Sequence, residues 1–225
     1  YAFQYVVDGT IYIADPYADK VLDPWNDSYI PSTVYPDLKP YPTGKAEGIV
    51  SVLQTGQTPY QWQVTDFKKP DRNQLMVYEM HIRDFTSEHS FNAAKDKLPY
   101  LKQLGINAIE LMPVNEFEGN SSWGYNPSFY FAVDKYYGTK NDMRAFVDEC
   151  HRQGIAVIID LVLNHSFGQS PFYLLYREAD GTPSAEIPGI IKSLIFLMLL
   201  CSGDMILIIK VRIPVRWWTV WPVSG

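Results

Sequence analysis

The sequence predicts an α/β fold built on a parallel sheet, with a small all-β module in front of it. Three observations lead to this fold class. Strand-like and helical segments alternate between residues 75 and 163, each helical segment ends in glycine, and the first 70 residues show only short strand patterns separated by turn residues. Such alternation is typical of right-handed βαβ units, in which each helix connects two parallel strands.

Residues 1–70 are expected to form the all-β module. The segment YAFQYVVDGTIYIADP alternates around Asp8-Gly9, a residue pair that favours a hairpin turn. Strand patterns also occur in GIVSVLQ (48–54) and YQWQVTDF (60–67). Because the chain begins with Tyr1 inside a strand pattern and without an initiator methionine, the module is expected to lack its first strands.

The polar stretch KKPDRN (68–73) is predicted to end this module. Five elements of the α/β region follow: strand LMVYEMHI (75–82), helix FNAAKDKLPYLKQLG (91–105), strand INAIELMPV (106–114), helix KNDMRAFVDECHRQG (140–154) and strand IAVIIDLVL (155–163). The last strand begins with the apolar, β-branched run of a strand buried on both faces. Doubly wound and (β/α)8 architectures both accommodate this order.

Composition excludes several classes of function. The net charge is −6 and no cluster of Lys and Arg is present, so a nucleic-acid partner is not expected. Glycine-rich phosphate-binding motifs do not follow the first strand. Cys150 and Cys201 form neither a disulfide framework nor a metal-ligand spacing. The 16 Tyr and 6 Trp residues fit both sugar stacking and ordinary core packing.

The ends of the three predicted strands carry polar and aromatic residues. These ends read HIRDF, MPVNEFEGNSSWGYNP and DLVLNH (160–165), and the second is expected to be a long loop. Working groups of parallel α/β folds lie beyond the C-terminal ends of the strands. Since buried polar groups without partners are costly, these three segments are expected to form a site.

The strand ends resemble the α-amylase family of glycoside hydrolases (family 13), whose catalytic domain is a (β/α)8 TIM barrel. DLVLNH fits the family signature D-x-x-x-N-H of the third barrel strand, while VYEMHIRDF, GINAIELMPV and WGYNPSFYF resemble the first strand, the second strand and the following segment. The resemblance implies that residues 71–186 form the first three strands of a partial barrel. It also implies that residues 1–70 form an immunoglobulin-like β-sandwich module of the pullulanase and branching-enzyme kind.

The same resemblance implies roles for four residues. Tyr125 would stack under a sugar ring, His165 would hydrogen-bond its hydroxyls, and Asp160 would support the site. Asn164 corresponds to a calcium ligand in the members that bind this ion, and no other cofactor is implied. Each residue also has a structural interpretation: Tyr125 could pack within its loop, and Asp160 could fix the loop backbone. Four further carboxylates have no implied catalytic role and are expected to be solvated or locally paired: Glu79, Glu110, Glu116 and Glu118.

The resemblance implies hydrolysis with retention of the anomeric configuration, which uses two carboxylates about 5 Å apart. The family carries them on the fourth and fifth barrel strands, and no matching segment is found in this sequence. The chain is therefore expected to be an inactive, truncated part of an enzyme acting on α-glucans such as starch or glycogen. A non-catalytic glucan-binding protein is the second hypothesis. The sequence leaves open whether the enzyme acts on α-1,4 or α-1,6 bonds and whether it hydrolyses or transfers chains. It also leaves open a cytoplasmic or a secreted location.

Residues 187–225 differ in composition from the rest of the sequence. They contain no Tyr, Asn, Gln, His, Glu or Ala, and four basic residues against one acidic residue give them a net charge of +3. A frameshift after Glu186 is the favoured hypothesis, because restoring one nucleotide lets the tail be recoded into a sequence resembling the family. The alternative is a membrane tether through residues 190–209, although Lys192 and Asp204 interrupt the roughly 20 apolar residues that a spanning helix needs.

Overall fold

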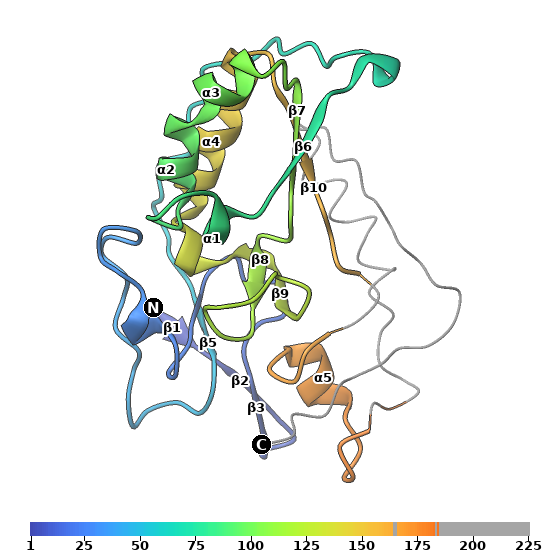
Figure 1. Cartoon of the computed structure of the whole chain (residues 1–225). Coiled ribbons are helices and arrows are strands. Elements are labelled where there is room, and N and C mark those ends of the chain that lie inside the picture. The colour runs from blue at the N-terminus through green and yellow to red at the C-terminus, as the bar shows by residue number, and fades with distance from the viewer. Residues whose placement is uncertain (164–165, 183, 185–225) are drawn as a thin grey trace.

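The computed structural model describes residues 1–163, 166–182 and 184, and its central element is a parallel sheet (Figure 1). The sheet contains three strands in the order β10–β7–β6: β6 (Val77–Met80), β7 (Ala108–Leu111) and β10 (Ala156–Ile159). Both β6 and β10 pair with β7 in parallel register, which confirms the predicted βαβ arrangement. Within the described residues the sheet is open, and no closed barrel is formed.

One face of the sheet is covered by three helices: α2 (Phe91–Asp96), α3 (Leu98–Gln103) and α4 (Lys140–Arg152). Alternate strand residues such as Ile109, Leu111 and Val157 enter the main hydrophobic core beneath these helices. Strand residues of the opposite face, Ala108, Ala156 and Ile158, pack against Phe67 and Leu75 in a separate small cluster. This two-faced burial explains the continuous apolar run of β10.

The helix predicted over residues 91–105 is divided into α2 and α3, which corrects the expectation of one continuous helix. Lys97, the residue between them, has φ −93° and ψ −3°. Pro99 follows within the first turn of α3. Proline lacks the backbone N–H and its ring clashes with the carbonyl four residues earlier, so it is compatible with the start of a helix but not with its interior. The break therefore follows from Pro99.

The segment after β7, expected to be a long loop, contains the antiparallel hairpin β8 (Asn115–Phe117) and β9 (Pro127–Val133). The loop expectation was wrong for β8, which is short and whose register with β9 shifts on both sides of Glu116, whereas residues 118–126 do form a loop. Phe117 and Tyr130 join the main core, so the hairpin is fixed to the helices. Residues 118–126 connect the two strands and are thereby held beyond the C-terminal ends of the parallel strands.

Residues 1–70 contain only short strands. A three-stranded antiparallel sheet has the order β1–β5–β4, and β2 and β3 form a separate hairpin: β1 (Ala2–Phe3), β2 (Tyr5–Val7), β3 (Ile11–Ile13), β4 (Val21–Leu22) and β5 (Val50–Val52). The Asp8-Gly9 turn is confirmed, since both residues have positive φ and Thr10 N donates to Val7 O at 3.2 Å. The immunoglobulin-like assignment and the boundary near residue 70 stay predictions.

The segment YQWQVTDF (60–67) is not a strand, contrary to prediction. It runs along α4, where the buried Asp148 carboxylate accepts hydrogen bonds from Gln63 N at 2.9 Å, Val64 N at 3.0 Å and Tyr60 Oη at 3.0 Å. Further along, the Phe67 ring stacks on His151 with 4.0 Å between ring centroids. The backbone donors that a strand would have paired with a neighbour are thus satisfied by one side chain.

Replacing Asp148 with asparagine is expected to lower the free energy of unfolding by about 1.5–3 kcal/mol, because a buried charged acceptor is lost. The new amide group would also present N–H donors to the N–H groups of Gln63 and Val64. Native-state hydrogen exchange should show faster exchange at these two amides. In the control Asp71→Asn, the altered carboxylate accepts from Asn73 N and, within the described residues, has no bond to residues 63 and 64, so exchange there should not change. Unaltered exchange in Asp148→Asn would contradict this assignment.

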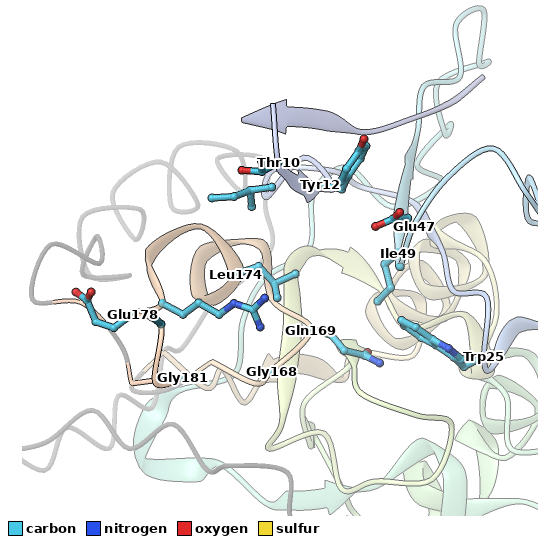
Figure 2. Close-up of a pocket in the computed structure, with 14 residues that line it drawn as sticks. Thr10, Tyr12, Trp25, Glu47, Ile49, Gly168, Gln169, Leu174, Glu178 and Gly181 are labelled. Atoms are coloured by element: carbon cyan, nitrogen blue, oxygen red, sulfur yellow. The ribbon is translucent and has the colours of Figure 1, made fainter. Parts of the chain in front are cut away.

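Helix α5 (Pro171–Tyr176) lies against the N-terminal part of the chain. The Phe172 ring meets Tyr17 edge to face at 6.2 Å between centroids. Figure 2 shows Leu174 of α5 and Gln169 near Ile49 and Trp25, which come from the first 70 residues. No helix of the described residues is long and apolar enough to span a membrane, and residues 190–209 lie outside that part of the chain.

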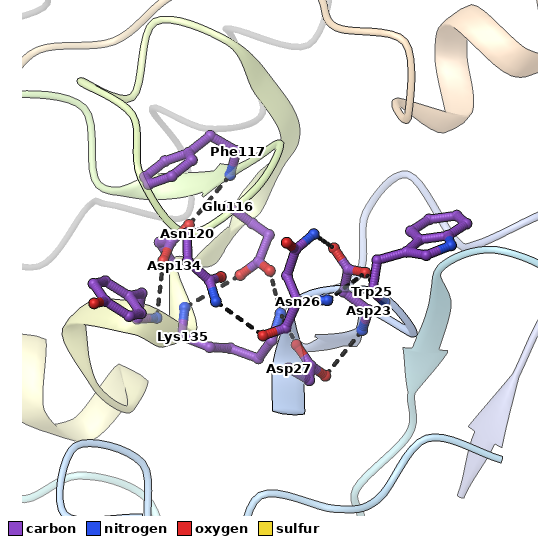
Figure 3. A network of polar contacts seen from close by, with 10 residues as sticks. Asp23, Trp25, Asn26, Asp27, Glu116, Phe117, Asn120, Asp134 and Lys135 are labelled. Carbon is purple, nitrogen blue, oxygen red and sulfur yellow. Dashed lines mark hydrogen bonds and ion pairs between the residues drawn. The ribbon is translucent and has the colours of Figure 1, made fainter. Parts of the chain in front are cut away.

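A buried charged cluster joins the N-terminal part to the β8–β9 hairpin (Figure 3). Lys135 is 3% exposed and forms an ion pair with Glu116. Its Nζ atom also lies 3.3 Å from Asp27 Oδ1. Asp27 lies in the short 3-10 helix η1 (Asp27–Tyr29), Lys135 begins another, η3 (Lys135–Tyr137), and Glu116 lies on β8. A third 3-10 helix, η2 (Arg72–Gln74), contains none of these residues. Burial raises the pKa of Asp27 and Glu116, and that of Asp134 well above its ordinary value. Glu116 is therefore locally paired, as predicted.

Candidate functional site

Tyr125 and Asp160 meet at the C-terminal edge of the parallel sheet. Asp160 directly follows β10, and its backbone N–H donates to Leu111 O at the end of β7 at 2.9 Å. Tyr125 belongs to the loop between β8 and β9, and its hydroxyl donates to Asp160 Oδ2 at 2.8 Å. The structure thus brings together two residues that the sequence singled out, 35 positions apart in the chain.

The Tyr125 phenol is held in its protonated form. Burial, the hydrogen bond to Asp160 and the nearby carboxylates of Glu79 and Glu110 all raise its pKa. Its hydroxyl therefore remains a donor to Asp160 across the physiological range. The residue is still 38% exposed. A ring with a fixed hydroxyl and an accessible surface is suited to stacking against the C–H face of a sugar.

Gly124 sets the position of Tyr125. Its φ is +87°, and a Cβ atom built on it would lie 2.4 Å from Pro113 O and 2.8 Å from Pro113 Cβ. The loop backbone thus crosses directly over the residues that follow β7. Only glycine fits this close approach together with this backbone conformation.

Arg83 holds the same loop from the end of the first parallel strand. It lies in the short helix α1 (Ile82–Phe85), and its guanidinium donates to Ser122 O at 3.2 Å and Ser121 Oγ at 3.3 Å. Asp84 accepts from Arg83 Nε at 2.7 Å and from Nη2 at 3.0 Å. These bonds, more than any other contact, lower the pKa of Asp84. The guanidinium is therefore oriented toward the loop that carries Tyr125.

His81 lies beside Asp84, the carboxylate that orients Arg83. Its Nδ1 lies 2.8 Å from Asp84 Oδ2 and its Nε2 lies 3.1 Å from Tyr137 Oη. Sequence reasoning noted HIRDF as a polar strand end but assigned no role to His81, Arg83 or Asp84. The signal was their position, because three of the four residues that follow the buried Met80 are polar or charged, with only Ile82 between them.

The remaining acidic residues near the sheet have separate environments. Glu79 and Glu110 lie side by side on β6 and β7, in register with each other. They project on the strand face opposite the helices, since their neighbours Met80, Ile109 and Leu111 point into the main core. Burial, followed by the charge of Asp23, raises the pKa of the half-buried Glu118.

His165 and Asn164 lie outside the described residues, as does Cys201. In the described part of the chain, no group of three or more His, Cys, Asp or Glu side chains is arranged to hold a metal ion. Cys150 is a buried free thiol of α4. The calcium site at Asn164 and the role of His165 therefore stay predictions.

Comparison with known proteins shows what this region is similar to. The α-amylase catalytic-domain family matches residues 87–182. A malto-oligosyltrehalose trehalohydrolase from Saccharolobus solfataricus is 40% identical over 119 residues, covering 53% of this chain and 21% of that protein. The 1,4-α-glucan branching enzyme GlgB of Thiobacillus denitrificans is 34% identical over 180 residues, covering 74% of this chain and 22% of that protein. The chain thus spans about a fifth of the length of these curated relatives.

A solved structure shares the architecture. The catalytic module of SpuA, a glycogen-degrading pneumococcal virulence factor, matches with a TM-score of 0.57 and 27% identity, covering 84% of this chain and 32% of that one. This match extends the similarity beyond the residues of the family match. Residues 87–182 therefore match the α-amylase catalytic-domain family, the same family that the strand ends resemble.

Proposed function

We propose that this protein is part of an α-amylase-family enzyme that acts on α-glucans. In this proposal residues 71–186 supply the first three strands of a (β/α)8 barrel, and the cleft lies at their C-terminal edge. The observation that carries it is the hydrogen bond from Tyr125 Oη to Asp160 Oδ2 at 2.8 Å, which fixes an accessible aromatic ring at this edge. The names of the two relatives concern an α-glucan and a maltooligosaccharide derivative, which supports the class of substrate.

The residues of the proposed cleft bind and orient the sugar. The Tyr125 ring would lie under the apolar face of a pyranose, and Asp160 would keep the ring in place through its hydroxyl. His165 would donate to the sugar hydroxyls. A ring that is already immobilised loses little conformational freedom on binding, so more of the stacking free energy contributes to affinity.

Bond cleavage would need groups that this chain does not supply. Retaining hydrolysis uses a nucleophilic carboxylate and an acid/base carboxylate about 5 Å apart, on either side of the glycosidic bond. Asp160 accepts the Tyr125 hydroxyl, and Glu116 is paired with Lys135 in the charged cluster. We therefore propose that the 225-residue chain binds α-glucans without hydrolysing them.

Affinity electrophoresis through gels containing glycogen tests this proposal. The unaltered chain should be retarded, and Tyr125→Ala should weaken the retardation, since loss of a stacking ring corresponds to roughly a 3- to 10-fold weaker affinity. Tyr125→Phe keeps the ring and should fall between the two. Tyr100→Ala is the matched control, because Tyr100 is an exposed tyrosine of α3 that is 57% exposed. Equal mobility of all four proteins would contradict the glucan site.

The same protein samples, incubated with starch, pullulan and glycogen, should release no new reducing ends. Turnover would contradict the proposed absence of catalysis. Asp204→Asn serves as the control in that case, because Asp204 is the single carboxylate within residues 187–225. Activity that this change abolishes belongs to the chain, whereas a contaminating amylase is insensitive to it.

A further inference from the structure

A pocket of about 700 Å³ lies between the N-terminal part and the segment around α5, away from the Tyr125–Asp160 pair. Four stretches of chain line it: the β2–β3 hairpin, Trp25, Glu47–Ile49, and residues within 168–181. Neither Tyr125 nor Asp160 is among its lining residues. Ligand sites in proteins commonly have volumes of about 300–1,000 Å³, so this pocket has the size of a small-molecule or oligosaccharide site.

Two accessible aromatic rings belong to the lining. Tyr12 is 43% exposed and Trp25 is 56% exposed, whereas folded proteins usually bury most of the surface of large aromatic side chains. The Trp25 ring lies close to the backbone of Gly48, where an added Cβ would be 3.8 Å from its Cη2 atom. This contact leaves much of the Trp25 side chain accessible. Both rings are therefore available to a ligand with an apolar face.

A polar group of the pocket also has an unused hydrogen-bonding capacity. Gln169 Oε1 is buried and accepts no hydrogen bond within the described residues. Figure 2 shows the Gln169 side chain next to Trp25, within the group of residues that line the pocket. A buried acceptor without a donor is unfavourable, so a ligand hydroxyl placed there would gain a hydrogen bond that the protein alone does not make.

The charges of the lining favour a neutral ligand. Glu47 and Glu178 are acidic and Arg177 is the one basic residue among the lining side chains. A phosphate or a carboxylate would meet more negative than positive charge, so sugar phosphates, nucleotides and acidic sugars are disfavoured. Aromatic rings, a buried amide acceptor and mixed charges together suit a molecule that has apolar faces and a rim of hydroxyl groups.

We propose that this pocket is a second carbohydrate-binding site, which takes a neutral oligosaccharide between Tyr12, Trp25 and Gln169. The choice of an α-1,4-linked glucan as its ligand rests on the function proposed above. The pocket itself stands on its lining alone. Because it joins the N-terminal part to residues 168–181, an oligosaccharide bound there would contact both parts at once.

Isothermal titration of the full chain with maltoheptaose tests this site in a Tyr125→Ala background, where the first site is weakened. Residual binding is expected, and adding Tyr12→Ala or Trp25→Ala should weaken it by roughly 3- to 10-fold, in line with the loss of one aromatic contact. Tyr5→Ala and Trp62→Ala are the matched controls. Tyr5 is 48% exposed on the same hairpin and Trp62 is 40% exposed, and neither lines the pocket.

The outcomes separate the two sites. Residual binding that Tyr12→Ala and Trp25→Ala leave unchanged overturns the second site, whatever Tyr125→Ala does. Binding that responds to Tyr12 and Trp25 but not to Tyr125 supports the second site and contradicts the first. Since Trp25→Ala could disturb folding, its thermal unfolding is compared with that of Tyr12→Ala. The two variants must also agree in the loss of affinity for maltoheptaose. Tighter binding of a galacturonate oligomer than of maltoheptaose would overturn the assignment of a neutral ligand.

Discussion

Replacing Lys135 with methionine is expected to lower the free energy of unfolding by about 3–5 kcal/mol at neutral pH, because removing one partner of a buried ion pair leaves the other charge buried and unpaired. Lys135 is the cation of the buried cluster, and its partners Glu116 and Asp27 are also buried. Methionine preserves most of the side-chain volume, so the effect isolates the charge. Urea unfolding followed by circular dichroism measures it.

The pH dependence of this effect has a definite sign. Burial raises the pKa values of Asp27, Glu116 and Asp134 in the folded state, so each favours folding most below its unfolded value near 4 and loses this contribution as the pH rises through its folded value. Burial acts to lower the pKa of Lys135, but the carboxylates of Glu116 and Asp27 outweigh it and raise it. Lys135 thus stays protonated throughout the range between pH 4 and pH 8, and its stabilising effect grows as its carboxylate partners ionise.

Lys135 lowers the pKa values of Asp27, Glu116 and Asp134, so removing it should raise these pKa values further. The difference in stability between the unaltered protein and Lys135→Met should therefore be small near pH 4 and should grow toward pH 8. Lys140→Met is the matched control: Lys140 pairs with Asp19, and these side chains are 33% and 46% exposed. An exposed pair contributes about 0–1 kcal/mol, so this variant should be nearly as stable as the unaltered protein. Equal losses at pH 4 and pH 8 for Lys135→Met would refute the assigned charge states.

Replacing Gly124 with alanine is expected to lower the free energy of unfolding by about 2–5 kcal/mol, which combines the unfavourable left-handed backbone with overpacking. The new methyl group would lie 2.4 Å from Pro113 O, so the loop must move. Because Tyr125 is the next residue, its hydroxyl should be displaced from Asp160. Retardation of this variant in glycogen gels should then fall to the level of Tyr125→Ala.

Gly119 provides the control for this substitution. It lies in the same loop with φ +80°, but an added Cβ would have no heavy atom within 4 Å. Gly119→Ala should therefore lower the free energy of unfolding by only about 1–2 kcal/mol and keep the gel retardation. If the two alanine variants were equally stable and equally retarded, the close approach to Pro113 would not be what positions Tyr125.

Much of the α/β region was predictable because its signals are local. The β-branched run ending at Ile159 and the glycine after α4 predicted a strand and a helix that the structure contains. Pro99 also carried a local signal for the break between α2 and α3, which helical spacing alone concealed. In the candidate site, Tyr125 and Asp160 were found through motifs at the strand ends.

The wrong strand prediction for residues 60–67 and the residues that sequence patterns missed have a common physical origin in partners that are distant in sequence. YQWQVTDF has the alternation of a strand, yet its amides are satisfied by Asp148, 84 and 85 positions away. Arg83 acts on the loop of Tyr125 through Ser122, 39 positions away. No pattern around Lys135 indicates burial, because its carboxylate partners come from other segments. Side chains whose environment is built by remote segments need the tertiary structure.

The hydrogen bonds that Asp148 accepts also determine an order of events during synthesis. Tyr60, Gln63 and Val64 leave the ribosome well before Asp148, since 84 to 88 residues separate each from its partner. At about 5–20 residues per second, this interval lasts roughly 4 to 18 seconds. Throughout it, the aromatic segment from Tyr60 to Phe67 has no α4 to pack against. Contacts so far apart in sequence slow folding, and the nascent chain exposes apolar rings until α4 emerges.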